Sequence, residues 1–163
     1  MPRRQLALFA LCVALLGVGG CDPGILTNYR QVGVMWGPSH QVRILVGHCP
    51  GERVLEVSLV NDDDRVLWEV DSKEGTQTYD FLVGTTPPGF QEAAPLAADS
   101  LPAGELDAVV TTSQMKDAYD PFTTSQLRTD QVLRGGRIRD DPIEDAYMSE
   151  AQFLSQELNC PAP

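Results

Sequence analysis

Hydrophobic and polar residues alternate along much of the chain after residue 28. A period of two is the pattern of a β-strand with one buried face. The alternating apolar positions are Val32, Val34, Trp36; Val42, Ile44, Val46; Leu55, Val57, Leu59; Val66, Trp68, Val70; Tyr79, Phe81, Val83; and Leu106, Ala108, Val110. Turn-forming residues separate these stretches at 37–39, 50–51 and 61–64. About seven short strands with regular turn signals predict a β-sandwich, with a small β-barrel as the alternative.

Residues 85–104 break this pattern. The segment holds Pro87, Pro88, Pro95 and Pro102, and it is long for a connection inside a compact domain. Two interpretations remain open for it: a short edge strand at about residues 90–93, or a binding loop. After Met115 the chain is polar up to Arg128, where we expect no strand.

The stretch LPAGELDAVV, residues 101–110, resembles the penultimate strand of many immunoglobulin-like and fibronectin-type sandwiches, in which the pattern LPAGxYxVxV is common. Leu106 stands where those domains often have tyrosine, so the hydrogen bond of a tyrosine corner is not expected here. The resemblance implies a single immunoglobulin-like β-sandwich.

The C-terminal residues predict a last strand or hairpin and then a short helix. Val132, Leu133 and Ile138 surround Gly135-Gly136 in the expected hairpin. Ser149 and Gln152 have the spacing of a capping box, which marks a helix start. The spacing of Ala151, Leu154 and Leu158 predicts the buried face of that helix, with Cys160 at its end.

The first residues have the layout of a secretory signal. Arg3 and Arg4 precede an apolar run from Leu6 to Val18, which is shorter than the roughly 20 residues that cross a bilayer. The run ends in Val18-Gly19-Gly20-Cys21, which resembles the lipobox of bacterial lipoproteins. A plain signal peptide with a chance cysteine and a retained membrane helix are the alternatives.

The lipobox resemblance implies that the Cys21 thiol receives diacylglycerol and that the chain is cleaved after Gly20. Residues 1–20 are then a removed signal peptide, residues 21–28 a lipidated tether, and residues 29–163 a single β-rich domain. The acyl chains anchor the protein at the extracytoplasmic face of the cell membrane, because two chains bind a bilayer far more firmly than one. No cofactor is expected besides this covalent lipid.

Charge narrows the range of partners. The 163 residues carry 12 Lys and Arg against 23 Asp and Glu, a net charge of −11. Without Arg3 and Arg4 the balance is 10 against 23, or −13. Binding to nucleic acid depends on basic residues that neutralise phosphates, so nucleic acid is excluded as a partner. Contact of the domain with anionic lipid is disfavoured for the same reason.

The four cysteines separate by position. Cys12 lies in the apolar run and Cys21 in the lipobox, which leaves Cys49 and Cys160. A remaining pair in an exported protein predicts a disulfide. A metal pair or a reactive thiol are the alternatives, although two cysteines and two histidines make a poor zinc set.

Candidate catalytic and metal-binding motifs are weak. Residues 113–116 (SQMK) match the S-x-x-K spacing of penicillin-recognising serine enzymes, but the S-D-N and K-T-G partners are absent. His40 and His48 are the two histidines, and the chain has no G-x-S-x-G elbow. Asp62, Asp63 and Asp64 are weak metal candidates, because consecutive turn residues cannot all face one ion.

Residues 140–141 form a second acidic turn, and a calcium site requires that the two acidic turns meet. The tryptophans are predicted to face the core, with a pocket at the rim of the fold as the alternative for Trp36.

These observations predict a lipid-anchored, monomeric protein of the cell envelope. The absence of a catalytic motif favours a non-enzymatic binding or accessory module, with an envelope protein as a possible partner. Two alternatives remain: a small envelope hydrolase whose site is scattered along the chain, and a carrier with an apolar interior. Substituting His40 and His48 and assaying a substrate panel separates the enzyme from the binding module.

Overall fold

The computed structural model describes residues 32–96, 101–115, 118–134, 146–156, 158 and 160. These residues form ten β-strands, two 3-10 turns and one short α-helix. The strands are β1 (Val32–Trp36), β2 (Val42–Val46), β3 (Val54–Asn61), β4 (Val66–Thr76), β5 (Asp80–Leu82), β6 (Gln91–Ala94), β7 (Glu105–Thr112), β8 (Ala118–Thr123), β9 (Val132–Arg134) and β10 (Ala146–Met148). The helical elements are η2 (Pro38–His40), η3 (Thr124–Gln126) and α1 (Glu150–Leu154).

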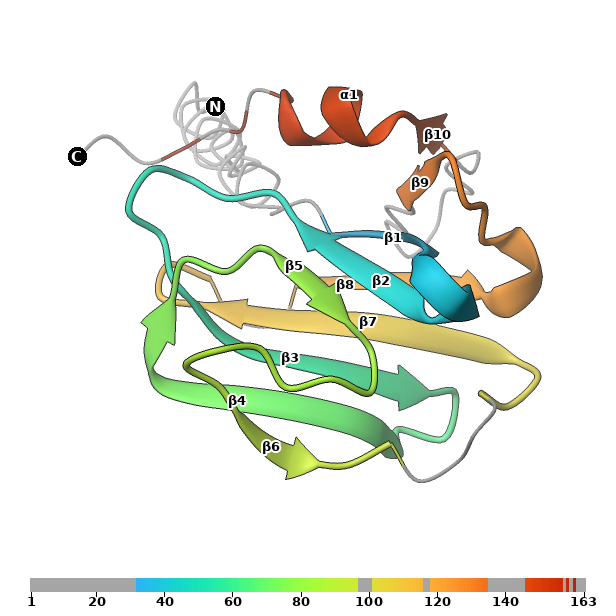
Figure 1. The fold of residues 1–163 in the computed structure, drawn as a ribbon, viewed down its shortest axis with the longest axis horizontal. Helices are drawn as coiled ribbons and strands as arrows, with labels where there is room; N and C mark the ends of the chain where they lie inside the picture. The colour runs from blue at the N-terminus through green and yellow to red at the C-terminus, as the bar shows by residue number, and fades with distance from the viewer. Residues whose placement is uncertain are drawn as a thin grey trace, which may run out of the picture.

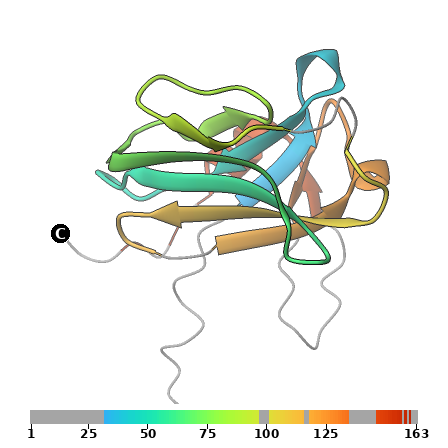
Figure 2. The ribbon, with the colours of Figure 1, turned by 90° about the horizontal axis from the view of Figure 1, so that it is seen from below.

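The strands form two antiparallel sheets that face each other (Figure 1). Sheet A has the order β10-β9-β1-β2-β5, and sheet B has the order β6-β4-β3-β7-β8. Figure 2 shows the same layers after a quarter turn. Among the described residues the two sheets do not join into a closed barrel, so the sandwich is confirmed and the barrel alternative is wrong.

Strands β1, β2 and β5 are neighbours in sheet A, and β4, β3, β7 and β8 are neighbours in sheet B. Strand β7 holds residues 105–110 of the stretch LPAGELDAVV and lies between β3 and β8. Strands β9 and β10 extend sheet A and β6 extends sheet B, which explains why ten strands form instead of about seven.

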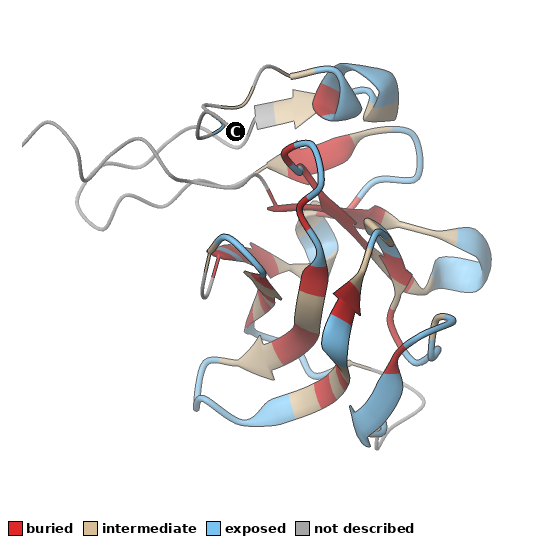
Figure 3. Cartoon of the chain, turned by 90° about the vertical axis from the view of Figure 1, so that its left-hand side faces the viewer, coloured by how far each residue is buried: buried red, intermediate tan, exposed pale blue. Residues whose placement is uncertain are grey.

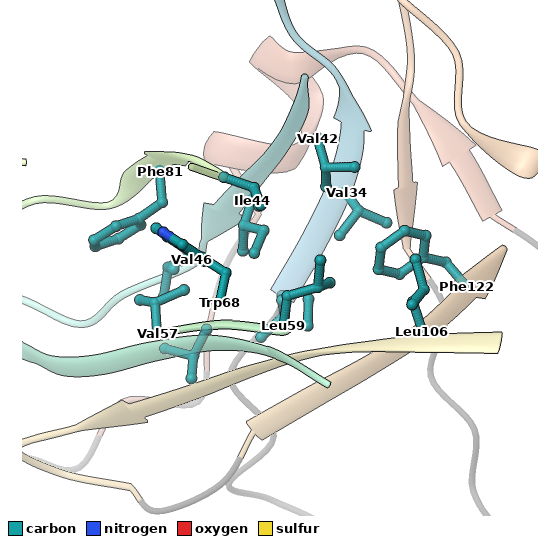
Figure 4. Close-up of a cluster of buried hydrophobic side chains, with 14 of the residues drawn as sticks. Val34, Val42, Ile44, Val46, Val57, Leu59, Trp68, Phe81, Leu106 and Phe122 are labelled. Carbon is teal, nitrogen blue, oxygen red and sulfur yellow. The ribbon is translucent and has the colours of Figure 1, made fainter. Parts of the chain in front are cut away.

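The core lies between the sheets, where the alternating positions of both inner faces meet. Figure 3 shows buried positions along the strands of both sheets and exposed positions on many of the turns. In Figure 4 the side chains of Val42 and Ile44 on sheet A point toward Leu59 and Trp68 on sheet B. All four are at most 1% exposed. Burial of large apolar side chains contributes about 1.5–3 kcal/mol each, so this interface is the main source of stability.

The outer face of sheet A is covered by α1 (Figure 1). Phe153 is buried there against Met35, Leu45 and Val132. Gly33 makes room for it, because a Cβ at that position would lie 2.7 Å from the Phe153 ring. The small residue on β1 therefore determines how closely the helix approaches the sheet.

The buried face predicted for the helix is wrong. The capping box of Ser149 and Gln152 is confirmed, but α1 ends at Leu154 rather than at Cys160. Ala151 is exposed and Leu154 is 53% exposed, whereas Phe153 is 1% exposed. The cause is the short length of the helix: a single turn buries the one side chain that faces the hollow above Gly33.

Arg43 fixes α1 to the sheet. Its guanidinium donates to both carboxyl oxygens of Asp80 on β5, at 2.8 and 2.7 Å. It also donates to both oxygens of Glu150 on α1, at 2.7 and 2.8 Å. These two carboxylates, Asp80 foremost, raise the pKa of Arg43 above its usual value. One side chain thus connects β2, β5 and the start of the helix.

Two further differences concern strands. The edge strand expected in the Pro-rich segment is confirmed as β6, but β8 forms in a stretch where no strand was expected. In β3 a register shift between Val54 and Glu56 turns Leu55 away from the fully buried positions.

Residues 1–31, with the predicted signal peptide, the Val18–Cys21 motif and the tether, lie outside the described residues. No described helix has the length and apolar character that a membrane span requires.

Candidate functional site

A pocket of about 580 Å³ opens at one end of β2. We call it the rim pocket. Its volume lies within the range of roughly 300–1,000 Å³ in which proteins bind small molecules. The lining residues come from the β1–β2 hairpin, the loop after β5, strand β6 with the Pro-rich segment, and η3: Trp36, His40, Gln41, Val42, Val83, Gly84, Glu92, Pro95, Leu96, Leu101 and Thr124.

The β1–β2 hairpin forms the first wall. The amide of Gly37 donates to the carbonyl of Gln41 at 2.8 Å, which closes the turn. Inside the turn, Ser39 and His40 have φ values of 59° and 57°. Residues other than glycine rarely adopt this left-handed region, and such strain is concentrated at functional sites. The turn places the His40 ring 5.8 Å from the Trp36 ring, measured between centroids, at an angle of 41°.

The floor is formed by two buried valines. The amide of Val83 donates to the carbonyl of Val42 at 2.9 Å, so the β2–β5 pairing continues into the loop. Gln41 reaches across with its side-chain amide, which donates to the carbonyl of Val83 at 3.4 Å. The next residue, Gly84, has φ +84°, and a Cβ there would meet Leu96 at 3.3 Å. Gly84 therefore allows the Pro-rich segment to lie against the end of β5.

The second wall is β6 and the Pro-rich segment. Phe90, just before β6, packs edge-on against Phe81 with ring centroids 5.3 Å apart. Leu96 and Leu101 are half-buried and pack against the main core. Glu92 on β6 faces Val70, which is fully buried on β4. Residues opposite each other in an antiparallel pair share a face of the sheet, so Glu92 lies on the pocket side of β6, where it is exposed to solvent.

The opposite end of β2 holds a different cluster, which we call the disulfide end: Cys49, Glu52, Tyr79, Thr112 and Cys160. Cys49 and Cys160 form the predicted disulfide, with Cα atoms 5.6 Å apart and a sequence separation of 111. Glu52 is fully buried. Its carboxyl group accepts a hydrogen bond from the Cys49 amide at 2.7 Å and another from the Thr112 hydroxyl.

Tyr79 completes this cluster. Its hydroxyl donates to the main-chain carbonyl of Glu52 at 2.5 Å, and its ring stacks on His48 with centroids 3.4 Å apart. Burial, with the nearby Glu52 carboxyl group adding to it, raises the pKa of Tyr79 above the usual 10.0. Nothing in the sequence indicated Glu52: a single glutamate after a Pro-Gly turn looks like an exposed residue.

The remaining candidates lie apart from both ends. Asp62, Asp63 and Asp64 are exposed in the β3–β4 turn, where Asn61 accepts from the Arg65 amide at 2.9 Å. Within the described ranges no three His, Cys, Asp or Glu side chains are grouped so that they could hold a metal ion. Ser113 accepts from the Arg53 amide at 3.1 Å.

Three predicted positions cannot be placed. Cys21 of the lipobox, Lys116 of the S-x-x-K match and the acidic turn at 140–141 lie outside the described residues.

Of the predicted site residues, the structure brings together Cys49 and Cys160. It also places Trp36 at the rim rather than in the core, as the alternative interpretation held, and His40 beside it. Glu92 was missed, because its position on the pocket side depends on a register shift between Glu69 and Val70 that no sequence pattern announces. Comparison with known proteins found no matching family model, curated protein or solved structure.

Proposed function

We propose that this chain is a lipid-anchored envelope protein whose β-sandwich serves as a non-enzymatic binding module, with the rim pocket as its binding site. The observation that carries the proposal is the pocket itself: about 580 Å³, walled by a strained hairpin on one side and a Pro-rich segment on the other. Binding residues are commonly held on loops by a rigid scaffold, and this arrangement fits that rule.

The large side chains that fill the core argue against the carrier alternative. A carrier needs an apolar cavity between the sheets, yet Trp68, Phe81 and Phe122 are at most 1% exposed and fill that space (Figure 4). For the hydrolase, His40 contacts the Trp36 ring. Among the described residues, His40 has no hydrogen bond to a serine or a carboxylate. We therefore place binding ahead of catalysis.

Site-specific photo-cross-linking tests the proposal in membranes of the native host. A photoreactive phenylalanine derivative replaces His40, which is exposed and lines the pocket. The matched control carries the same group at Tyr119, which is 51% exposed on β8 and outside the pocket. We expect a defined adduct from position 40 and none from position 119. Equal labelling at both positions, or none at position 40, contradicts the binding site.

The anchor is tested in the same membranes. The N-terminal peptide of the wild type should begin at Cys21 and carry the mass of the acyl chains, and Cys21→Ser should remove that mass. An unmodified Cys21 in the wild type contradicts the lipid anchor without bearing on the pocket.

A further inference from the structure

Charge is distributed unevenly over the lining of the rim pocket. Glu92 contributes a carboxylate and His40 an imidazole, and no lysine or arginine is among the lining residues. The other contributors are two polar side chains, a glycine and six apolar residues: Trp36, Val42, Val83, Pro95, Leu96 and Leu101. Among the described lining residues, the pocket therefore combines apolar side chains with one carboxylate.

The position of Glu92 is the first part of the argument. It faces the fully buried Val70 across the β4–β6 pairing, so it lies on the pocket side of an edge strand, and it is exposed to solvent. A charge on an edge strand also discourages pairing with other chains. In this chain, however, the carboxylate lies beside a pocket rather than over packed side chains. A ligand that enters the pocket must pass close to it.

Trp36 is the second part. Its side chain is half-buried, lines the pocket and packs against the edge of the core. The face of an indole attracts a cation through its quadrupole. A carboxylate and an indole in one pocket are the two groups that recognise an organic cation.

We propose that the rim pocket binds an alkylammonium or guanidinium group carried on an apolar stem. Glu92 is the counter-ion, Trp36 contacts the cation, and the half-buried Leu96 and Leu101 contact the stem. The proposal rests on the rim pocket being the binding site. The net charge of −11 adds to it, because a negative field attracts cations and repels anions. Such a cation is either a free amine or a basic side chain of an envelope protein.

Three probes with one stem and different head groups test this inference: n-hexylamine, n-hexanol and n-hexanoate. The chain has two tryptophans, so 5-fluorotryptophan labelling gives two fluorine signals, assigned with Trp36→Phe. Trp36 reports on the pocket, and Trp68, which is fully buried, is the internal control. We expect n-hexylamine to shift the Trp36 signal and to bind about fivefold more tightly than n-hexanol. Hexanoate should bind most weakly, and added salt should reduce the preference for the amine.

Glu92→Gln should bring the amine to the affinity of the alcohol. Glu74→Gln removes the same charge from an exposed position on β4 outside the pocket and should leave the preference unchanged. Equal affinities of the wild type for amine and alcohol overturn the inference, as does a preference that survives Glu92→Gln. Circular dichroism of both variants confirms that the fold is retained.

The two proposals fail in different ways. If no probe shifts the Trp36 signal while the position-40 adduct still forms, the cation inference is wrong and the binding module stands. If the amine binds selectively but no adduct forms, the pocket recognises cations and the envelope role is wrong. The adduct also distinguishes the sources, because a cross-linked peptide that contains lysine or arginine indicates a protein side chain and a small adduct indicates a free amine.

Discussion

The two ends of β2 are built differently. At the disulfide end, the buried Glu52 carboxyl group accepts two hydrogen bonds, and a disulfide ties Cys49 to Cys160. At the rim pocket, the His40 backbone is strained and its ring contacts Trp36, and the Gln41 side chain donates a long hydrogen bond of 3.4 Å to the Val83 carbonyl. Stability is unevenly distributed within proteins, and ligand-binding segments come from its weaker regions. The comparison predicts that substitutions at the disulfide end reduce stability and that substitutions at the rim pocket reduce ligand binding.

Removing the disulfide should have the largest effect. A Cys49→Ala/Cys160→Ala protein should lose about 4 kcal/mol of unfolding free energy, because the cross-link restricts a loop of more than one hundred residues in the unfolded chain. Urea denaturation measures this loss. The reduced wild type, kept in a thiol buffer, should unfold at the same urea concentration as the variant. If this protein loses less than about 1 kcal/mol of unfolding free energy, the disulfide does not make its end of β2 more stable than the rim pocket.

The buried glutamate should have the second largest effect. Glu52→Gln replaces one acceptor oxygen with an NH₂ group, so either the Cys49 amide or the Thr112 hydroxyl loses its acceptor. A buried donor without a partner costs about 1–3 kcal/mol, and we expect about 2 kcal/mol in urea denaturation. Glu74→Gln, at an exposed position, is the matched control and should change stability by less than about 0.5 kcal/mol. If Glu52→Gln and Glu74→Gln lose the same unfolding free energy, the hydrogen bonds of Glu52 do not stabilise the disulfide end.

Tyr79→Phe should act through a hydrogen bond and through pH. Loss of the donor to the Glu52 carbonyl should cost about 1 kcal/mol at neutral pH. The pKa of Tyr79 is raised in the folded state, so its contribution is complete below the unfolded pKa of about 10 and is lost as the pH rises through the folded pKa. Melting curves from about pH 9 to about pH 12 should therefore show a steeper fall for the wild type than for Tyr79→Phe. Parallel curves would show that Tyr79 titrates alike in the folded and unfolded states.

The sequence predicted the parts of the fold that depend on local pattern. Val42, Ile44 and Val46 lie on the inner face of the sandwich, as a period of two requires, and the pairing of Cys49 with Cys160 followed from the cysteine count. What the sequence did not reveal depends on distant partners. Glu52 is buried through Thr112, 60 residues away.

The missed and misassigned elements have the same kind of cause. Strand β8 was missed because Asp120 and Pro121 interrupt its apolar pattern. The helix face was wrong because Gly33, far along the chain, accommodates Phe153. One wall of the rim pocket could be predicted, because Trp36 stands next to a Gly-Pro turn. The position of Glu92 could not be predicted, because it depends on the register of the β4–β6 pairing.

The smallest effect on stability is expected at the rim pocket. Leu101 is half-buried and lines the pocket, so Leu101→Ala removes apolar surface that solvent already reaches in part. We expect a loss of about 1 kcal/mol or less, below the 2–5 kcal/mol that the same truncation costs in a closed core. Leu59→Ala, at a position that is fully buried between the sheets, supplies that comparison within the chain. Binding of n-hexylamine should respond in the opposite order: Leu101→Ala weakens it several-fold, because the stem loses a contact, whereas Leu59→Ala leaves it unchanged wherever the protein is folded. If Leu101→Ala destabilises the protein as strongly as Leu59→Ala does, the rim pocket belongs to the core, and the contrast between the two ends of β2 is wrong.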